Sequence, residues 1–293
     1  VHRGILFLMG TDKEHGNLII RRSEDRGNTW SSPIDSITGL LRTGEYHTAP
    51  MPVISYRGRI WRAVECARSN TDIWGKRYSA MIISAPDSAD LLQAASWSVT
   101  DSLPYDSTYL DGKFGAWLEG NAVVTPDGNV ADLLRVDYAP GPEYAALIRL
   151  CDSVSFDPFD PEKDFVRMPG GAKKFTVRYD SLSGRYWSLV NYVTQEWAGK
   201  QNPAWVRNTL ALSSSPNLQE WTVHRTVLHH PDIAKHGFQY ADWLFDGNDI
   251  VLLSRTAYDD NGTGAHNCHD ANYMTFHRIK DFRKALTEQA GNR

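Results

Sequence analysis

The sequence predicts an all-β protein, a β-propeller made of repeated antiparallel blades. Short apolar strands recur in repeats of roughly 45 to 65 residues, each with a glycine turn and a tryptophan. The first repeat contains Ser23-Glu24-Asp25-Arg26-Gly27-Asn28-Thr29-Trp30, the Asp-box pattern Ser-x-Asp-x-Gly-x-Thr-Trp. Its Asp and Gly suit a tight turn between outer strands, and we expect Trp30 to fill the core of its blade.

The composition and charge argue against several classes of function. The 293 residues include ten tryptophans and 41% hydrophobic residues, enough for a large core. A net charge of −4 gives no electrostatic case for nucleic acid or an anionic membrane. The early apolar run Ile5–Met9 is too short to cross a bilayer. Three cysteines without paired spacing imply no disulfide framework, and no phosphate loop or Gly-x-Ser-x-Gly elbow points to a cofactor or a serine nucleophile.

The first repeat has strands near Ile5–Met9 and Asn17–Arg21, followed by the Asp-box. Its opening segment His2-Arg3-Gly4 matches Tyr56-Arg57-Gly58 in the second repeat. We therefore expect an inner strand of the first blade to precede Val1. The prediction is a single propeller domain over residues 1–293 that lacks an N-terminal strand or a whole blade.

About five repeats are visible, and the later ones are centred on glycine turns. These turns are Arg57-Gly58, Asp127-Gly128, Ser183-Gly184 and Asp246-Gly247. The segments Ser88–Trp97 and Ser215–Trp221 look like degenerate Asp-boxes, and a short helix is expected near Asp281–Glu288. The third repeat predicts a hairpin from Trp117 to Arg135 with a Pro-Asp-Gly turn.

Polar residues recur at equivalent stations around these turns. Within the predicted hairpin, Glu119 and Arg135 fall opposite each other, roughly 5 Å apart. By themselves they read as a cross-strand ion pair on a sheet surface. However, the same stations hold polar residues in the other repeats, namely His47, Lys174 and Tyr240 before the turns and Glu65, Asn191 and Arg255 after them. Polar residues at equivalent strand ends predict a lined pocket at the propeller axis.

The ordered motifs resemble the sialidase (neuraminidase) superfamily over nearly the whole chain. They are the Asp-box blades, Glu119 sixteen residues before Arg135, Arg207-Asn208-Thr209-Leu210 ahead of a box, and Gln239-Tyr240-Ala241-Asp242. The resemblance implies a six-bladed propeller and an exo-acting, retaining glycoside hydrolase. It also implies a glycan substrate with a terminal acidic sugar, sialic-acid-like or uronic, and an extracellular or periplasmic location.

The same resemblance implies roles for single residues. Tyr240 is the expected nucleophile, Glu119 its base, and Arg135 and Arg207 the second and third arginines that bind the substrate carboxylate. A carboxylate on the anomeric carbon would repel an anionic nucleophile, whereas a neutral phenol, with a pKa of about 10, needs a nearby base. Arginine suits the carboxylate because its planar fork binds both oxygens. Further candidates for substrate binding are Arg255, His47, Glu65 and Gln239.

Two members of the family pattern have no match before Ser23, namely the first arginine and the acid Asp. His47 and Glu65 are the candidates for another acid. Alternatives to the hydrolase are a carbohydrate-binding propeller without catalysis, a polysaccharide lyase on uronates that uses a Tyr/His pair, and a plain scaffold.

The stretch His266–Asp270 and His277 fit no standard zinc template, so no metal site is predicted. These residues suit a loop and a closing strand, with His269 or Asp270 a possible lining of the pocket. Lys173-Lys174 suits a solvated strand end better than an anion site.

Overall fold

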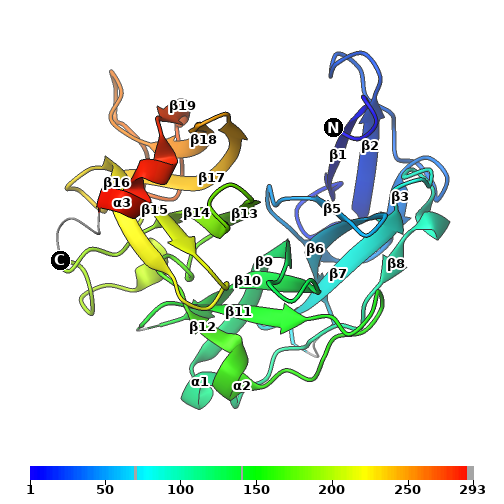
Figure 1. The fold of residues 1–293 in the computed structure, drawn as a ribbon, viewed down its shortest axis with the longest axis horizontal. Coiled ribbons are helices and arrows are strands. Elements are labelled where there is room, and N and C mark those ends of the chain that lie inside the picture. The colour runs from blue at the N-terminus through cyan, green and yellow to red at the C-terminus, as the bar shows by residue number, and fades with distance from the viewer. Residues whose placement is uncertain (69–70, 140, 289–293) are drawn as a thin grey trace. The chain divides into compact units, whose positions relative to one another are not determined.

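The computed structural model describes residues 1–68, 71–139 and 141–288. Within these ranges, the chain forms five antiparallel sheets of three to five strands (Figure 1). The α-helices α1 (Tyr109–Gly112), α2 (Pro161–Asp164) and α3 (Ala285–Glu288) have four residues each. The predicted all-β fold is therefore confirmed, and each sheet is an antiparallel blade of the propeller type.

The chain divides into two compact units. The N-terminal unit comprises Val1–Asp106, Ala116–Leu133 and Ile148–Phe159, and the C-terminal unit comprises Ser107–Gly115, Leu134–Leu147 and Asp160–Arg293. Each unit has its own buried core and its own set of polar strand ends. The prediction of a single domain stays a prediction.

The N-terminal unit contains the first two sheets. The first has the order β1-β2-β3, and in the second β6 pairs with β4, β5 and β7, and β7 pairs with β8. The strands are β1 (Leu6–Thr11), β2 (Leu18–Ser23), β3 (Leu40–Arg42), β4 (Tyr46–His47), β5 (Ile54–Tyr56), β6 (Arg59–Ala67), β7 (Tyr78–Pro86) and β8 (Ser98–Val99). Leu18, Val64 and Met81 belong to one buried core that joins the two sheets. A short 3₁₀ helix, η1 (Ala94–Ser96), precedes β8.

The C-terminal unit contains the last two sheets, ordered β13-β14-β15-β16 and β17-β18-β19. The strands are β13 (Thr176–Asp180), β14 (Arg185–Asn191), β15 (Thr209–Ser215), β16 (Thr222–His229), β17 (Gly237–Asp246), β18 (Asp249–Ala257) and β19 (Tyr273–Ile279). Trp187 and Trp243 lie in the core that both sheets share. The 3₁₀ helix η2 (Pro203–Trp205) precedes β15.

The chain end is helical, as predicted. The 3₁₀ helix η3 (Phe282–Lys284) leads directly into α3. The Phe282 ring packs edge-on against Trp187 at 5.0 Å between centroids. Arg283 donates from Nε and Nη2 to the two carboxylate oxygens of Asp180, at 2.7 and 2.6 Å. This two-pronged pair ties the end of the chain to β13.

The third sheet has the order β12-β11-β10-β9 and contributes residues to both units. Its strands are β9 (Phe114–Val124), β10 (Val130–Tyr138), β11 (Tyr144–Arg149) and β12 (Phe165–Arg167). Between β9 and β10, Thr125 N–H donates to Asn129 O at 2.8 Å and Gly128 N–H to Thr125 O at 2.9 Å. The predicted hairpin is confirmed, while the opposition of Glu119 and Arg135 across it stays a prediction.

The two matched turns of the sequence have the same backbone. Arg57 and Gly58 have φ of 49° and 71°, and Arg3 and Gly4 have φ of 49° and 79°. Two successive residues with positive φ make a type I′ turn, whose twist suits a hairpin. His2 and Ile5 exchange both backbone hydrogen bonds across the first of these turns, at 2.9 and 3.0 Å.

The loops at Ser23–Trp30 and Ser215–Trp221 share one hydrogen-bond pattern. Asp25 Oδ1 accepts from the Ser23 hydroxyl at 2.8 Å, and Asn217 Oδ1 accepts from the Ser215 hydroxyl at 3.2 Å. The Trp30 indole N–H donates to Gly27 O, whereas the Trp221 indole donates to Leu218 O. Leu218 replaces the glycine of the turn and takes a positive φ of 68°.

The prediction for Trp30 is wrong. Trp30 is 37% exposed and stays outside the buried core, because its indole folds back onto Gly27 of its own loop. Trp97 of the second repeat is buried in the core that the first two sheets share, with its indole donating to Leu91 O at 3.0 Å.

No helix among the described residues is long and apolar enough to cross a membrane. Cys66, Cys151 and Cys268 are all free thiols.

Candidate functional site

Tyr240 lies in a β-bulge of β17. Gln239 pairs with Arg255 of β18, but the register then shifts, so that Asp242 pairs with Leu253. Tyr240 has a positive φ of 52°, the left-handed region that costs a non-glycine residue about 1 kcal/mol or more. A bulge redirects one side chain out of the regular alternation, and strained backbone of this kind collects at functional sites.

Two arginines flank the Tyr240 ring. The guanidinium carbon of Arg255 lies 4.8 Å from the ring centroid and that of Arg207 lies 6.0 Å away. The His269 ring stands edge-on to Tyr240 at 6.2 Å between centroids. Both guanidinium groups therefore place positive charge beside the Tyr240 ring.

Arg207 is held rigidly by its neighbours. Its Nε donates to Ala204 O at 2.9 Å and its Nη1 to Gln239 Oε1 at 2.8 Å. The amide nitrogen of Gln239 donates to the carbonyls of Cys268 and His269, at 2.8 and 2.7 Å. Gln239 is fully buried, and its side-chain amide contacts protein groups in place of a substrate. In this structure, the predicted substrate ligand Gln239 positions Arg207.

His269 joins the cluster through its backbone and its ring. Arg255 Nη2 donates to His269 O at 3.1 Å. Burial lowers the pKa of the His269 imidazole, and the charges of Arg207 and Arg255 lower it further, against the opposing effect of Asp270. His269 is therefore neutral at pH 7. Of the two pocket-lining alternatives, His269 is the one in ring contact with Tyr240.

A buried ion pair lies in the same unit. Lys173 Nζ contacts the Glu143 carboxylate and donates to Pro203 O at 2.9 Å. Burial lowers the Lys173 pKa, and the charges of Arg207 and Arg135 act in the same direction. Arg135 itself is buried, with its Nε donating to Ala172 O at 2.9 Å.

The expectation of a solvated strand end at Lys173-Lys174 is wrong. Both side chains are buried, because each ammonium group finds acceptors inside the protein. Lys174 Nζ donates to Thr176 Oγ1 at 2.7 Å and to Ala241 O at 2.9 Å. Lys174 thus fixes the bulge immediately after Tyr240.

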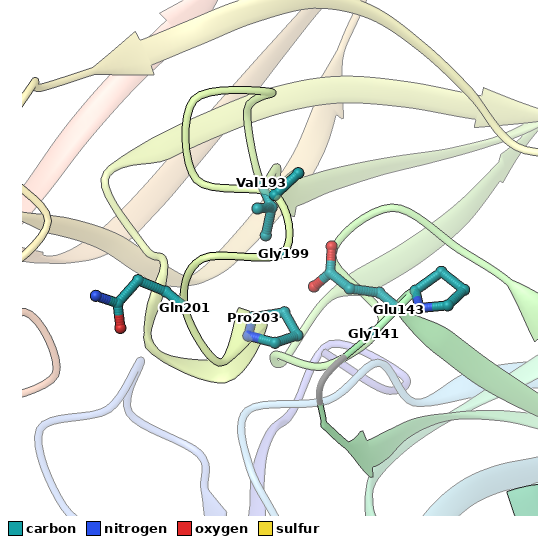
Figure 2. A pocket seen from close by; sticks show the side chains of 8 residues that line it. Gly141, Glu143, Val193, Gly199, Gln201 and Pro203 are labelled. Carbon is teal, nitrogen blue, oxygen red and sulfur yellow. The ribbon is translucent and has the colours of Figure 1, made fainter.

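A hollow of about 420 Å³ opens beside Glu143, lined by Gly141, Pro142, Glu143, Val193, Ala198, Gly199, Gln201 and Pro203. Figure 2 shows the Glu143 carboxylate directed toward the loop that carries Val193 and Gly199. The Lys173 ammonium therefore holds a carboxylate that also lines open space.

The N-terminal unit brings together two other predicted residues. His47 of β4 pairs with Glu65 of β6, and His47 Nδ1 lies 3.0 Å from Glu65 Oε2. The second oxygen, Glu65 Oε1, accepts from Gly120 N–H at 3.0 Å. Glu65 is fully buried and His47 partly exposed, so His47 connects a buried carboxylate with the surface.

Glu119 has the same backbone feature as Tyr240. It is buried in β9 with a positive φ of 53°. A Cβ on the next residue, Gly120, would lie only 2.2 Å from Asp132 Oδ1, so only glycine fits there. Glu119 and Tyr240 belong to different units, and their predicted partnership as base and nucleophile stays a prediction.

Asp132 was missed by the sequence reasoning. Within the described part of the chain, neither of its carboxyl oxygens has a hydrogen-bond partner. Complete burial raises its pKa well above the usual value, and the charge of Glu65 raises it further. The only signal in the sequence was the glycine at 120, which leaves room for this side chain.

Comparison of the sequence with protein-family models finds no match, and comparison with curated proteins finds none either. Solved structures do match. An α-L-arabinofuranosidase from Lactobacillus brevis has a TM-score of 0.54 at 10% identity, covering 94% of this chain and 86% of its own. A sialidase from Trypanosoma rangeli has a TM-score of 0.54 at 12% identity, covering 96% of this chain and 46% of its own.

The chain has the β-propeller fold. At these identities the similarity establishes the fold alone, and the chain spans less than half the length of the sialidase. The β-propeller fold expected from the sialidase resemblance is confirmed, with five of the six expected blades among the described residues. Roles for individual residues rest on their chemistry.

Proposed function

We propose that the chain is a retaining glycoside hydrolase that releases a terminal acidic sugar from a glycan. The observation that carries the proposal is the Tyr240 phenol, held in a strained bulge between the guanidinium groups of Arg207 and Arg255. The arabinofuranosidase and sialidase of similar fold add support for a glycosidase. An extracellular or periplasmic location belongs to the same proposal.

The chemistry begins with the substrate carboxylate, which Arg207, Arg135 and Arg255 would bind. Arg207 and Arg135 are already fixed by backbone carbonyls, so little side-chain entropy is lost on binding. The Tyr240 oxygen attacks the anomeric carbon and its phenolic proton passes to a base, the role that the sialidase resemblance gives to Glu119. The bond to the leaving oxygen breaks as that oxygen takes up a proton from an acid, for which His47 and Glu65 are the sequence candidates. Water then hydrolyses the glycosyl–Tyr240 bond.

Two features suit a phenol to this task. The unperturbed pKa of a tyrosine is about 10, so ionisation at neutral pH requires help. Arg207 and Arg255 provide fixed positive charge beside the ring, and the neutral His269 adds none. The charge that develops on the phenol oxygen during proton loss is thereby stabilised.

A second candidate function is a polysaccharide lyase on uronates. The observation that favours it is the contact between Tyr240 and the neutral ring of His269, 6.2 Å apart. A neutral imidazole can accept a proton from the carbon next to the uronate carboxylate while the arginines bind that carboxylate. The C–O bond to the leaving chain then breaks, its oxygen takes the Tyr240 proton, and the product would contain a new carbon–carbon double bond that absorbs in the ultraviolet.

The deciding experiment combines one variant with a panel of substrates. Wild type, Tyr240→Phe and the control Tyr179→Phe, an exposed tyrosine of β13, are tested on aryl glycosides of sialic and uronic acids and of neutral sugars. We expect release from an acidic glycoside by wild type and Tyr179→Phe, with turnover lost but binding kept in Tyr240→Phe. Full activity of the Tyr240→Phe variant would show that Tyr240 is not the nucleophile.

Two other results would redirect the assignment. Binding of acidic sugars by wild type without any release indicates a carbohydrate-binding propeller. Ultraviolet absorbance generated from a polyuronate, and lost in His269→Gln, indicates the lyase.

A further inference from the structure

We propose that His230, His236 and Asp259 form a binding site for a divalent transition metal. The three residues belong to the C-terminal unit and each offers one ligand atom, with these atoms all within 4.8 Å of one another. His230 and His236 bracket the loop between β16 and β17, and Asp259 follows β18 (Figure 1). The site is separate from the residues assigned to catalysis.

His236 is oriented by a carboxylate. Its Nδ1 lies 2.7 Å from Asp232 Oδ2. Asp232 is itself fixed, because it accepts from the backbone N–H groups of Ala234 and Lys235 at 2.9 and 3.1 Å. The carboxylate therefore places a proton on Nδ1, and in the neutral imidazole Nε2 presents a lone pair. A carboxylate that holds the far nitrogen of the ring in this way is the usual companion of a metal-binding histidine.

The free nitrogen of His236 is buried and aimed at a second ligand. The side chain is only 6% exposed, and among the described residues Nε2 has no hydrogen-bond partner. It lies 3.2 Å from Asp259 Oδ2. Two lone pairs this close repel each other unless a metal ion or a proton lies between them.

The separation also suits a shared metal. Zinc binds imidazole nitrogen at about 2.0–2.1 Å and carboxylate oxygen at about 2.0–2.2 Å. Two such ligands at a tetrahedral angle are about 3.4 Å apart, and at a right angle about 3.0 Å. The distance between His236 Nε2 and Asp259 Oδ2 is 3.2 Å, which lies between these values.

His230 supplies the third ligand after a rotation of its ring. The His230 and His236 rings are stacked, 3.5 Å apart and 15° from parallel. A metal lies in the plane of the imidazole that binds it, so two stacked rings cannot share one ion without movement. Among the described residues, the rotation gives up one hydrogen bond to this ring, from Asp232 N–H to His230 Nδ1 at 3.1 Å. Two imidazoles and a carboxylate favour Zn²⁺, Co²⁺ or Ni²⁺ over Ca²⁺.

The metal would join the loop before β17 to the end of β18. His236 directly precedes Gly237, the first residue of the strand that carries Tyr240. Tyr258 covers the pair, with its ring edge-on to His230 and His236 at 5.3 and 5.0 Å. Binding should therefore stabilise the fold, and stability gives a readout independent of catalysis.

The test uses the full chain without a histidine tag, after treatment with a chelator. Zn²⁺ and Co²⁺ are titrated while heat of binding, the visible absorption of tetrahedral Co²⁺ and the thermal unfolding temperature are measured. We expect one ion per chain and a higher unfolding temperature. His236→Gln and Asp259→Asn should each weaken binding at least tenfold, and Asp232→Asn by about 10- to 100-fold.

The matched control is His266→Gln, because exposed His266 also lies beside an aspartate, Asp270, at 3.1 Å. This variant should bind the metal as wild type does. Asp259→Asn guards against misfolding, since the Asp259 side chain is 73% exposed. No uptake by wild type overturns the proposal and leaves His236 as a protonated ion-pair partner. Unchanged affinity in Asp259→Asn, or equal loss in His266→Gln, also overturns it.

Discussion

The candidate site residues that the two units bury differ in charge. The N-terminal unit buries the carboxyl groups of Glu65, Glu119 and Asp132. The C-terminal unit buries cationic side chains, namely Arg135, Lys173, Lys174 and Arg207. Burying any charge is costly unless it is compensated, so each unit retains these groups at the expense of stability. The contrast suggests that the C-terminal unit is the one suited to bind an anion.

The largest expected effect comes from removing the buried ammonium group of Lys173, whose charge the Glu143 carboxylate balances. Lys173→Met leaves the Glu143 carboxylate without its ammonium partner and should lower the free energy of unfolding by about 3–5 kcal/mol. Urea denaturation measures this change. The double variant Lys173→Met/Glu143→Leu should recover most of the loss, because no charge is then stranded. A double variant as unstable as the single one would mean that packing, not charge, sets the effect.

The next effect concerns anion binding. The Arg207→Lys variant cannot keep both hydrogen bonds that Arg207 donates, to Ala204 O and to Gln239 Oε1. We expect kcat/KM for the acidic substrate to fall about 100-fold, equivalent to about 3 kcal/mol. The control is Arg178→Lys, whose guanidinium instead binds Trp243 O and Asp242. Equal losses of kcat/KM in the two variants would show that Arg207 has no specific role in substrate recognition.

The smallest expected effect concerns the buried carboxyl group of Asp132 in the N-terminal unit. Because the folded-state pKa of Asp132 is raised, folded protein keeps a proton that the unfolded chain releases above about pH 3.9. The free energy of unfolding must then fall as the pH rises from about 3.9 toward the folded pKa. Asp132→Asn should remove this slope and stabilise the protein at pH 7 by about 1–3 kcal/mol. Denaturation of both proteins between pH 4 and 8 would show the difference, and parallel pH profiles would refute it.

The strands and turns could be predicted from the sequence because their signals are local. Arg57-Gly58 and Asp127-Gly128 are dipeptides that specify a turn wherever they occur between apolar runs. The order of Glu119, Arg207 and Tyr240 along the chain also carries information, and the roles it predicts for them stay predictions. Their conformations could not be predicted, because nothing local announces that Glu119 and Tyr240 share a left-handed backbone.

The errors were non-local in origin. Lys173-Lys174 reads as a solvated pair, yet the acceptors that bury it come from Glu143, Pro203 and Ala241, which are distant in sequence. Trp30 has the spacing of a core tryptophan, but its indole hydrogen bond keeps it on its own loop. The three metal ligands proposed here are spread over 30 positions, from His230 to Asp259, and fit no linear template.

The bulge at Tyr240 also limits how the chain can be redesigned. Lys174 Nζ and Thr176 Oγ1 both donate to Ala241 O, at 2.9 and 3.2 Å, so the backbone cannot slide to compensate for a shorter side chain. Asn and Asp tolerate the left-handed region better than tyrosine does, but they are several ångströms shorter. The hydrogen bonds to Ala241 O therefore fix the backbone beside position 240. Only a side chain as long as tyrosine can then place a polar group where the Tyr240 hydroxyl lies.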